Sequence, residues 1–330
     1  MMSSLSEMPS FPTLASGLIF KLEISIDMKI RHILSLCLLL AFSFNSMACD
    51  ICGCANSGSY FGLLPQSHKS VIGLRYQHLN FVTHRDSKVL RTDESFNIGE
   101  VYARFFPVKR VQVMAFVPYR TDKQVTSADV KKQNGLGDIT VLANYNLFNT
   151  FMDNENSGSF SHTLMVGGGI KLPTGNFKFD ENNTLEVANA NFQLGTGSTD
   201  FILSAFYTVN KDQWGFATNI SRKFNTTNSQ DYRFGNQLYG TVDLYRSFQI
   251  GKISLTPSVG VYGEHAAHGV QKGEVLEITG GKMLNATAGV TFFSNKWTLG
   301  ITGQKPVAQK SASGHVIAKE RVLVQLGFLF

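Results

Sequence analysis

The chain has 330 residues, of which 16% are charged, and its formal net charge is +6. A mean hydropathy of -0.03 is too polar for a bundle of membrane helices, whereas 30 glycines and 26 phenylalanines depart from the composition of an ordinary soluble enzyme. Many of the cations fall near expected turns and strand ends, and no nucleic-acid-binding motif occurs, so the sequence gives little support to a nucleic-acid partner.

The N-terminal part has the organisation of a secretory signal peptide. A basic segment precedes a short apolar run, Ile33 to Met47, which ends in the small-x-small cleavage pattern Ser46-Met47-Ala48. The run is too short for a membrane helix. We therefore expect a signal peptide over 28–48, with residues 1–27 as an over-called start.

A cysteine cluster follows directly, with Cys49, Cys52 and Cys54 in a C-x-x-C-x-C pattern. Such thiols are soft ligands for Cu(I) or Zn(II), with His68 as a candidate fourth ligand, and two of them are equally able to form a disulfide in an oxidising compartment. Lipidation of Cys49 is a third alternative. We expect the segment 49–69 either to hang in the periplasm or to enter the folded body as a plug.

From Ser70 onward, twelve segments have the length and the alternating apolar pattern of strands that cross an outer membrane. The last one ends on the aromatic residue Phe330. Connections alternate between tight turns and long polar loops, except for a long connection near 149–159 on the short-turn side. The segments are 70–82, 95–107, 109–120, 137–149, 160–173, 199–210, 212–224, 236–248, 251–264, 282–294, 296–305 and 319–330.

These features predict an all-β fold, an antiparallel up-and-down transmembrane β-barrel of about 12 strands over 70–330, in the bacterial outer membrane. The long connections are expected to face outside. They cover 83–94, 121–136, 174–198, 225–235, 265–281 and 306–318. A soluble β-sandwich also has alternating strands, but loops that are long on one side only, and aromatic residues near strand ends, favour the membrane barrel.

Each strand is expected to show one face to lipid and the other to a water-filled lumen. The expected lipid face includes Ile139, Val141, Ala143, Tyr145, Leu147, Leu164, Val166, Gly168, Ile170, Leu172, Phe201, Leu203, Ala205, Tyr207, Val209, Trp297, Leu299 and Ile301. The expected pore-lining residues are Arg75, Glu100, Arg104, Asn144, Asn146, Lys171, Asn219, Lys223 and Asp243.

Three glycine-containing motifs stand at ends of the expected strands: GLGDI at 135–139, GGIKLPTG at 168–175 and QLGTGSTD at 193–200. Glycines permit sharp bends, and Asp138 and Asp200 are suited to accept hydrogen bonds from nearby backbone at the rim. With these motifs, residues 130–210 resemble the outer-membrane transporter family typified by the meta-pathway phenol-degradation channels. The family does not uniformly carry the cysteine-rich N-terminus.

The resemblance implies an outer-membrane channel for small, often hydrophobic, organic solutes. We expect such solutes to pass through a polar lumen, with the loop 174–198 and the N-terminal segment as constrictions or gates. The alternative is a barrel that presents the cysteine cluster for metal binding or thiol exchange with a periplasmic metal or redox partner. Histidines 84, 265, 268 and 315 in the long loops suggest a further metal site, and no Gly-x-Ser-x-Gly nucleophile motif occurs, so we expect no enzyme and no certain cofactor.

Overall fold

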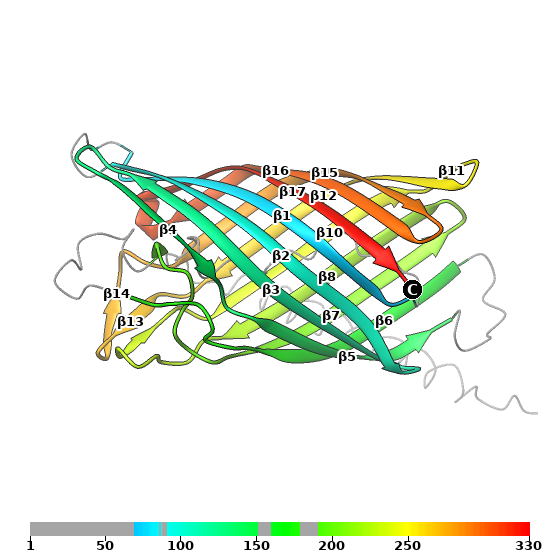
Figure 1. The fold of residues 1–330 in the computed structure, drawn as a ribbon, viewed down its shortest axis with the longest axis horizontal. Helices are drawn as coiled ribbons and strands as arrows, with labels where there is room; N and C mark the ends of the chain where they lie inside the picture. The colour runs from blue at the N-terminus through cyan, green and yellow to red at the C-terminus, as the bar shows by residue number, and fades with distance from the viewer. Residues whose placement is uncertain (1–68, 86, 88–90, 151–159, 179–190) are drawn as a thin grey trace, which may run out of the picture. The chain divides into compact units, whose positions relative to one another are not determined.

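The computed structural model describes residues 69–85, 87, 91–150, 160–178 and 191–330. Twelve of its strands form one closed antiparallel barrel (Figure 1). They are β1 (Val71–Thr83), β2 (Thr92–Val108), β3 (Val111–Val125), β5 (Thr140–Asn149), β6 (Phe160–Lys171), β7 (Asp200–Lys211), β8 (Trp214–Phe224), β10 (Gln237–Arg246), β12 (Ile253–Ala266), β15 (Gly281–Ser294), β16 (Trp297–Ser311) and β17 (Val316–Leu329). The predicted fold class and all twelve predicted strands are confirmed.

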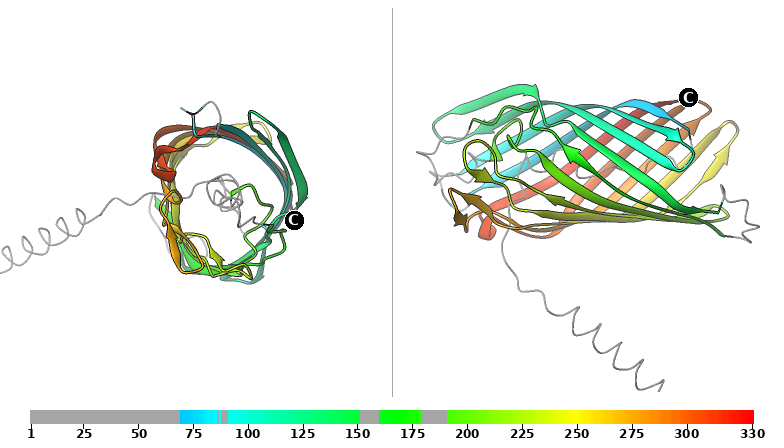
Figure 2. Two further views of the ribbon diagram at one scale, coloured as in Figure 1. Left: turned by 90° about the vertical axis from the view of Figure 1, so that its left-hand side faces the viewer. Right: turned by 90° about the horizontal axis from the view of Figure 1, so that it is seen from below.

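Each barrel strand pairs with the barrel strands before and after it in the chain, and β1 pairs with β17 to close the ring. The closure extends to the C-terminus, where Phe330 N donates a hydrogen bond to Ser70 O at 3.0 Å, a distance typical of a β-ladder. Seen end-on, the strands surround a central space (Figure 2). No helix among the described residues is long and apolar enough to cross a membrane.

Smaller elements extend the end of the barrel that carries the long connections. Strand β4 (Val130–Leu136) forms a hairpin with β3, and β9 (Tyr232–Arg233), β13 (Gly269–Gln271) and β14 (Glu274–Leu276) form a separate three-stranded sheet. The short 3-10 helix η2 (Ala312–Gly314) connects β16 to β17, and at the other end β11 (Phe248–Ile250) pairs with β12.

The prediction that 121–136 and 306–318 are loops is therefore wrong in part, because both segments are largely strand. Val125 pairs with Val130 across the β3–β4 turn, and Ser311 pairs with Val316 across the β16–β17 turn. Backbone hydrogen bonds continue here beyond the last alternating apolar residue, so the side-chain pattern ends before the strand does.

In most barrel strands buried and exposed side chains alternate between the two faces, although Phe81, Val82 and Thr83 at the end of β1 are all buried. In β10, for example, Tyr239, Thr241 and Asp243 are buried, whereas Leu238 and Leu244 are exposed. Because the outer surface of a barrel is the one open to solvent or lipid, the buried series points inward. The outward series is mainly apolar.

Aromatic residues and cations border this apolar belt at the short-turn end. Trp297 packs edge-on against Phe328 with ring centroids 5.1 Å apart, and the guanidinium of Arg246 lies 5.2 Å from the ring of Trp214. Aromatic girdles with cations reaching toward the head groups are typical of the two membrane interfaces.

Besides register shifts in pairs such as β1–β17 and β15–β16, the wall is irregular where β3 changes partner. It pairs with β5 only from Val111 to Phe116, and from Tyr119 onward it pairs with β4. The connection between them continues the wall through two backbone hydrogen bonds, from Gly137 N to Pro118 O and from Leu172 N to Ile139 O, both 2.8 Å long. All three glycine motifs lie beside this place.

Candidate functional site inside the barrel

The nine residues expected to line the pore all lie on barrel strands and on the inward side. Eight are buried and Asn219 is half-buried. Two of them bond inward side chains outside this set: Ser204 Oγ donates to Asn144 Oδ1 at 2.8 Å, and Asn219 Nδ2 donates to Thr241 Oγ1 at 2.7 Å. The structure thus places these residues on one continuous inner surface.

The charged members of this set are largely engaged with other groups. Arg75 Nη2 lies 2.5 Å from Glu100 Oε1, and Arg104 Nη2 donates to the carbonyl oxygen of Lys69 at 3.1 Å. Asp243 Oδ1 accepts a 3.3 Å hydrogen bond from Thr287. Paired charges produce a much weaker field in the lumen than separate ones would.

Many inward polar atoms have no hydrogen-bond partner within the described residues. They include Gln77 Nε2, Asn144 Nδ2, both amide atoms of Gln237, and Gln304 Nε2. Buried polar groups almost always have a partner, and water supplies it where the protein does not. This inner surface is therefore suited to hold water.

The glycine motifs meet on the inner wall around the ammonium group of Lys171. Its Nζ lies 2.6 Å from Asp138 Oδ2 and 2.8 Å from Asp200 Oδ2, and it also donates to Thr196 Oγ1 and, at 3.1 Å, to Ser198 O. A buried ammonium is stable only with such compensation, because its desolvation is expensive. Lys171 thus joins three separate segments of the chain.

The two aspartates also hold backbone groups of the connections. The carboxylate of Asp138 accepts hydrogen bonds from Gly175 N at 3.0 Å and Thr196 N at 2.8 Å. Asp200 Oδ1 accepts one from Thr226 N at 3.0 Å. These contacts confirm the prediction that both aspartates accept hydrogen bonds from neighbouring backbone.

One segment of the long connection before β7 folds against the inside of the wall. Residues 191–196 are all buried. The ring of Phe192 lies 6.1 Å from that of Phe96, and the carbonyl oxygen of Leu194 accepts a 3.4 Å hydrogen bond from the fully buried Arg120. The segment therefore takes up part of the interior.

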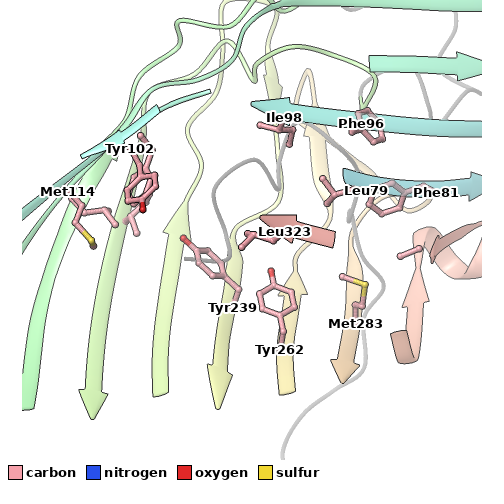
Figure 3. Close-up of a cluster of buried hydrophobic side chains, with 14 of the residues drawn as sticks. Leu79, Phe81, Phe96, Ile98, Tyr102, Met114, Tyr239, Tyr262, Met283 and Leu323 are labelled. Atoms are coloured by element: carbon pink, nitrogen blue, oxygen red, sulfur yellow. The ribbon is translucent and has the colours of Figure 1, made fainter. Parts of the chain in front are cut away.

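The inner surface also carries a large set of apolar and aromatic side chains, which the sequence analysis missed. They come from strands on several sides of the barrel and include Leu79, Phe81, Phe96, Ile98, Tyr102, Met114, Tyr239, Tyr262, Met283 and Leu323 (Figure 3). The sequence contains a signal for them: on β2, Phe96, Ile98 and Tyr102 share the phase of Glu100 and Arg104. The lumen is consequently amphipathic rather than uniformly polar.

A family of proteins described as "Putative MetA-pathway of phenol degradation" matches residues 93–313. The chain belongs to this family. The match extends well beyond the three motifs from which the resemblance was inferred, and with the closed twelve-stranded barrel it places the chain in the bacterial outer membrane.

Solved structures of outer-membrane barrels resemble this member of the family. An outer membrane channel from Pseudomonas putida F1 has 14% sequence identity and a TM-score of 0.62, over 82% of this chain and 100% of that one. The β domain of the Bordetella autotransporter BrkA has 10% identity and a TM-score of 0.47, over 79% of this chain and 100% of that one. At such identities the likeness concerns the fold. No curated protein matches the sequence.

The expected metal site lies outside the part of the chain that the structure describes. Cys49, Cys52, Cys54 and His68 all fall within residues 1–68, so metal binding, disulfide formation and lipidation stay predictions, as does the signal peptide. In the described ranges, no group of three or more His, Cys, Asp or Glu side chains is arranged to hold a metal ion.

The spacing of His265 and His268 predicts that both lie on one face of a helical turn, and this prediction is wrong. His265 lies in β12 and pairs with Lys282 of β15, so it shares no helical turn with His268, whose Nδ1 is 3.2 Å from Leu276 O. The rings of His84 and His315 do lie together, with centroids 5.1 Å apart.

Proposed function

We propose that this protein is an outer-membrane channel for small, neutral organic solutes that combine an aromatic or other apolar part with a hydrogen-bonding group. The observation that carries the proposal is the amphipathic inner surface of a closed barrel in this family. Phenol, which the family description names, is a solute of this kind. The proposal includes no chemical step on the solute.

The inner surface supports this solute class through its chemistry. Phe81, Phe96 and Tyr262 are inward aromatic side chains that other groups cover almost completely in this structure, and a small ring that replaced those groups would pack against them with favourable geometry. Enclosed amides without a protein partner, such as those of Gln77 and Gln237, would give hydrogen bonds to a solute hydroxyl in the same way. A solute thus exchanges part of its hydration for contacts at each stage of its passage.

Charge pairing supports neutral solutes over ions. Arg75 is matched by Glu100, Arg120 by Asp122 at 2.7 Å, and Lys171 by two aspartates. From sequence, the cations Arg75, Arg104, Lys171 and Lys223 opposite Glu100 and Asp243 predict a weak preference for neutral or anionic solutes. With Arg75, Arg120 and Lys171 paired to carboxylates, these three cations give little attraction to an anion entering from solution.

The inward-folded residues 191–196 support a constriction in the loop 174–198. Contacts with Phe96 and Arg120 fix this segment to the wall, so it narrows the path on one side. Gating by the N-terminal segment is part of the proposal too, although 49–68 and residues 179–190 of the loop lie outside the described ranges.

The test is the ion current of the purified protein in planar lipid bilayers, with phenol added as a blocker. We expect discrete channel events that phenol interrupts. The inward substitutions Phe206→Ser and Leu323→Ser each remove apolar contact worth about 1–2 kcal/mol, so half-block should need roughly tenfold more phenol.

Thr291→Ser is the matched control, because Thr291 is also buried on the inner surface but only one methyl group is lost. It should leave the phenol block near that of the wild type. A complete lack of channel events would refute the channel, whereas unchanged block in both Phe206→Ser and Leu323→Ser would refute the apolar contact surface.

A further inference from the structure

The outer surface of the barrel has an apolar hollow of about 550 Å³ over β17, β1, β2, β3 and β4, which lie side by side (Figure 1). Outward side chains of Leu74, Tyr76, Val101, Tyr119 and Leu136 are among those that line it. All of these are more than a third exposed, so they face away from the barrel interior.

Gly99 lies at the centre of the hollow. It pairs with Tyr76 on one side and with Tyr119 on the other, and both neighbours carry large outward side chains. A Cβ at Gly99 would meet nothing closer than Tyr119 O at 3.9 Å. The space above Gly99 is therefore open, with room for a chain of methylene groups.

A row of hydrogen-bonding groups borders the hollow on the side of the long connections. Tyr76 Oη donates to Asn97 Oδ1 at 2.8 Å, and the same oxygen lies 2.7 Å from His78 Nδ1. Asn97 Nδ2 donates to Thr121 O at 3.1 Å, and Thr121 pairs with Asn134. The outward surface thus changes here from apolar to polar, as it does where acyl chains end and head groups begin.

A pair of like charges follows this polar row. Lys123 of β3 and Lys132 of β4 pair directly across the hairpin, both exposed, and no ion pair to either is present in the described part of the chain. Like charges directly opposite each other in a sheet repel. The lysines lie two positions along their strands from Thr121 and Asn134, which is about 7 Å.

The order of these groups along the hairpin is apolar, then hydrogen-bonding, then cationic. We propose that this surface, defined by Gly99, Asn97, Thr121, Lys123 and Lys132, binds one phosphorylated glycolipid of the outer leaflet. An acyl chain lies in the hollow, the sugar contacts the polar row, and a phosphate lies between the lysines. This surface is separate from the lumen and does not depend on transport.

The glycolipid fits better than an ordinary anionic phospholipid because of the polar row. Tyr119 in the hollow and Lys123 are four positions apart on β3, about 13 Å, and the polar row between them leaves room for a sugar ring between acyl chain and phosphate. In a glycerophospholipid the phosphate follows the glycerol directly. The position at the end with the long connections agrees with the outer leaflet, which such connections normally face.

The test measures binding of lipid A with two phosphates to the purified full-length protein in phosphatidylcholine nanodiscs, by native mass spectrometry. We expect one bound molecule, with affinity lowered about 10- to 30-fold in the Lys123→Gln/Lys132→Gln double variant. Gly99→Leu, whose Cβ would come no closer than 3.9 Å to a backbone atom and whose side chain would occupy the hollow, should weaken binding to a similar extent.

Two control variants make the same chemical changes elsewhere on the outer surface. Lys282 and Lys310 also pair across strands, and Gly303 also has open space at its Cβ position. Lys282→Gln/Lys310→Gln and Gly303→Leu should bind lipid A as the wild type does. Equal unfolding midpoints for all variants show that each is folded.

Further lipids separate the sources of the phosphate. Lipid A with one phosphate should bind the wild type more weakly than lipid A with two phosphates. The two lipids should bind the Lys123→Gln/Lys132→Gln variant with equal affinity. Phosphatidylglycerol that displaces lipid A at equal concentration would overturn the proposal in favour of a phospholipid. Unchanged lipid A binding in both the double variant and Gly99→Leu would also overturn it.

Discussion

Lys171 is a buried cation whose compensation depends on carboxylates from two different segments. Replacing it with Met leaves Asp138 and Asp200 buried without their cation, and such losses cost about 3–5 kcal/mol. We expect the Lys171→Met variant to unfold at a correspondingly lower denaturant concentration. Urea unfolding in lipid vesicles, followed by tryptophan fluorescence, measures the change.

Removing the two carboxylates as well should recover part of this loss. The Lys171→Met/Asp138→Asn/Asp200→Asn variant removes the ammonium and both carboxylates together, although the backbone hydrogen bonds to Asp138 are weakened and the buried Lys223 loses two nearby negative charges. Lys252→Met, at an exposed turn, is the control and should change the unfolding free energy by less than about 0.5 kcal/mol. A triple variant no more stable than Lys171→Met would contradict this explanation.

The sequence predicted the chemical roles of Lys171, Asp138 and Asp200, but not that the three side chains contact one another. Glycine motifs and the position of Asp138 and Asp200 at strand ends predicted carboxylates that accept hydrogen bonds from backbone, and the phase of Lys171 predicted that it faces inward. Their convergence depends on the loop before β7 folding into the barrel. That fold rests on contacts such as Leu194 with Arg120, 74 residues apart, which no local pattern encodes.

At the scale of elements, the seam between β1 and β17 depends on close packing of Tyr102 against the inner wall. A Cβ at Gly73 would meet the carbonyl oxygen of Leu326 and come within 2.7 Å of the Tyr102 ring. Gly73→Ala therefore forces the first and last strands apart or displaces the tyrosine, which costs about 1–3 kcal/mol. Equilibrium unfolding in vesicles measures this cost.

Gly99 provides the control for the same substitution on the neighbouring strand. Its side-chain position faces outward into open space, so Gly99→Ala should leave stability unchanged or raise it by up to about 1 kcal/mol through the lower entropy of the unfolded chain. Equal destabilisation by Gly73→Ala and Gly99→Ala would show that a general strand effect, and not the seam, is responsible.

The strands themselves were predictable because lipid imposes alternation on every one of them. The alternation located all twelve, yet it missed the ends of β3, β16 and the whole of β4, which continue past the membrane where side chains such as Thr121 and Lys123 need not be apolar. The alternation also did not reveal the apolar part of the lumen. Ile98 has the same phase on β2 as Glu100, and a charged residue in that phase indicates a polar face.

At the scale of the whole molecule, the outward side chains define the depth of the barrel in the bilayer. On β3 the outward series runs from Val111 through Ala115 to Tyr119 and then turns polar at Thr121. Nine residues of tilted strand span the hydrocarbon layer. Ala115 is thus expected near the midplane, and Thr121 beyond the interface.

Arginine substitutions along β3 test this placement. An arginine on the lipid face costs about 2–4 kcal/mol at the midplane and about 0–1 kcal/mol near the interface, since only the first forces a guanidinium into hydrocarbon. Ala115→Arg should therefore lower the unfolding free energy in vesicles severalfold more than Thr121→Arg. In detergent micelles, which deform around a charge, the difference should shrink. Equal costs at both positions in vesicles would place the membrane boundary elsewhere on the barrel, and the lipid surface at Gly99 would lose its alignment with the head groups.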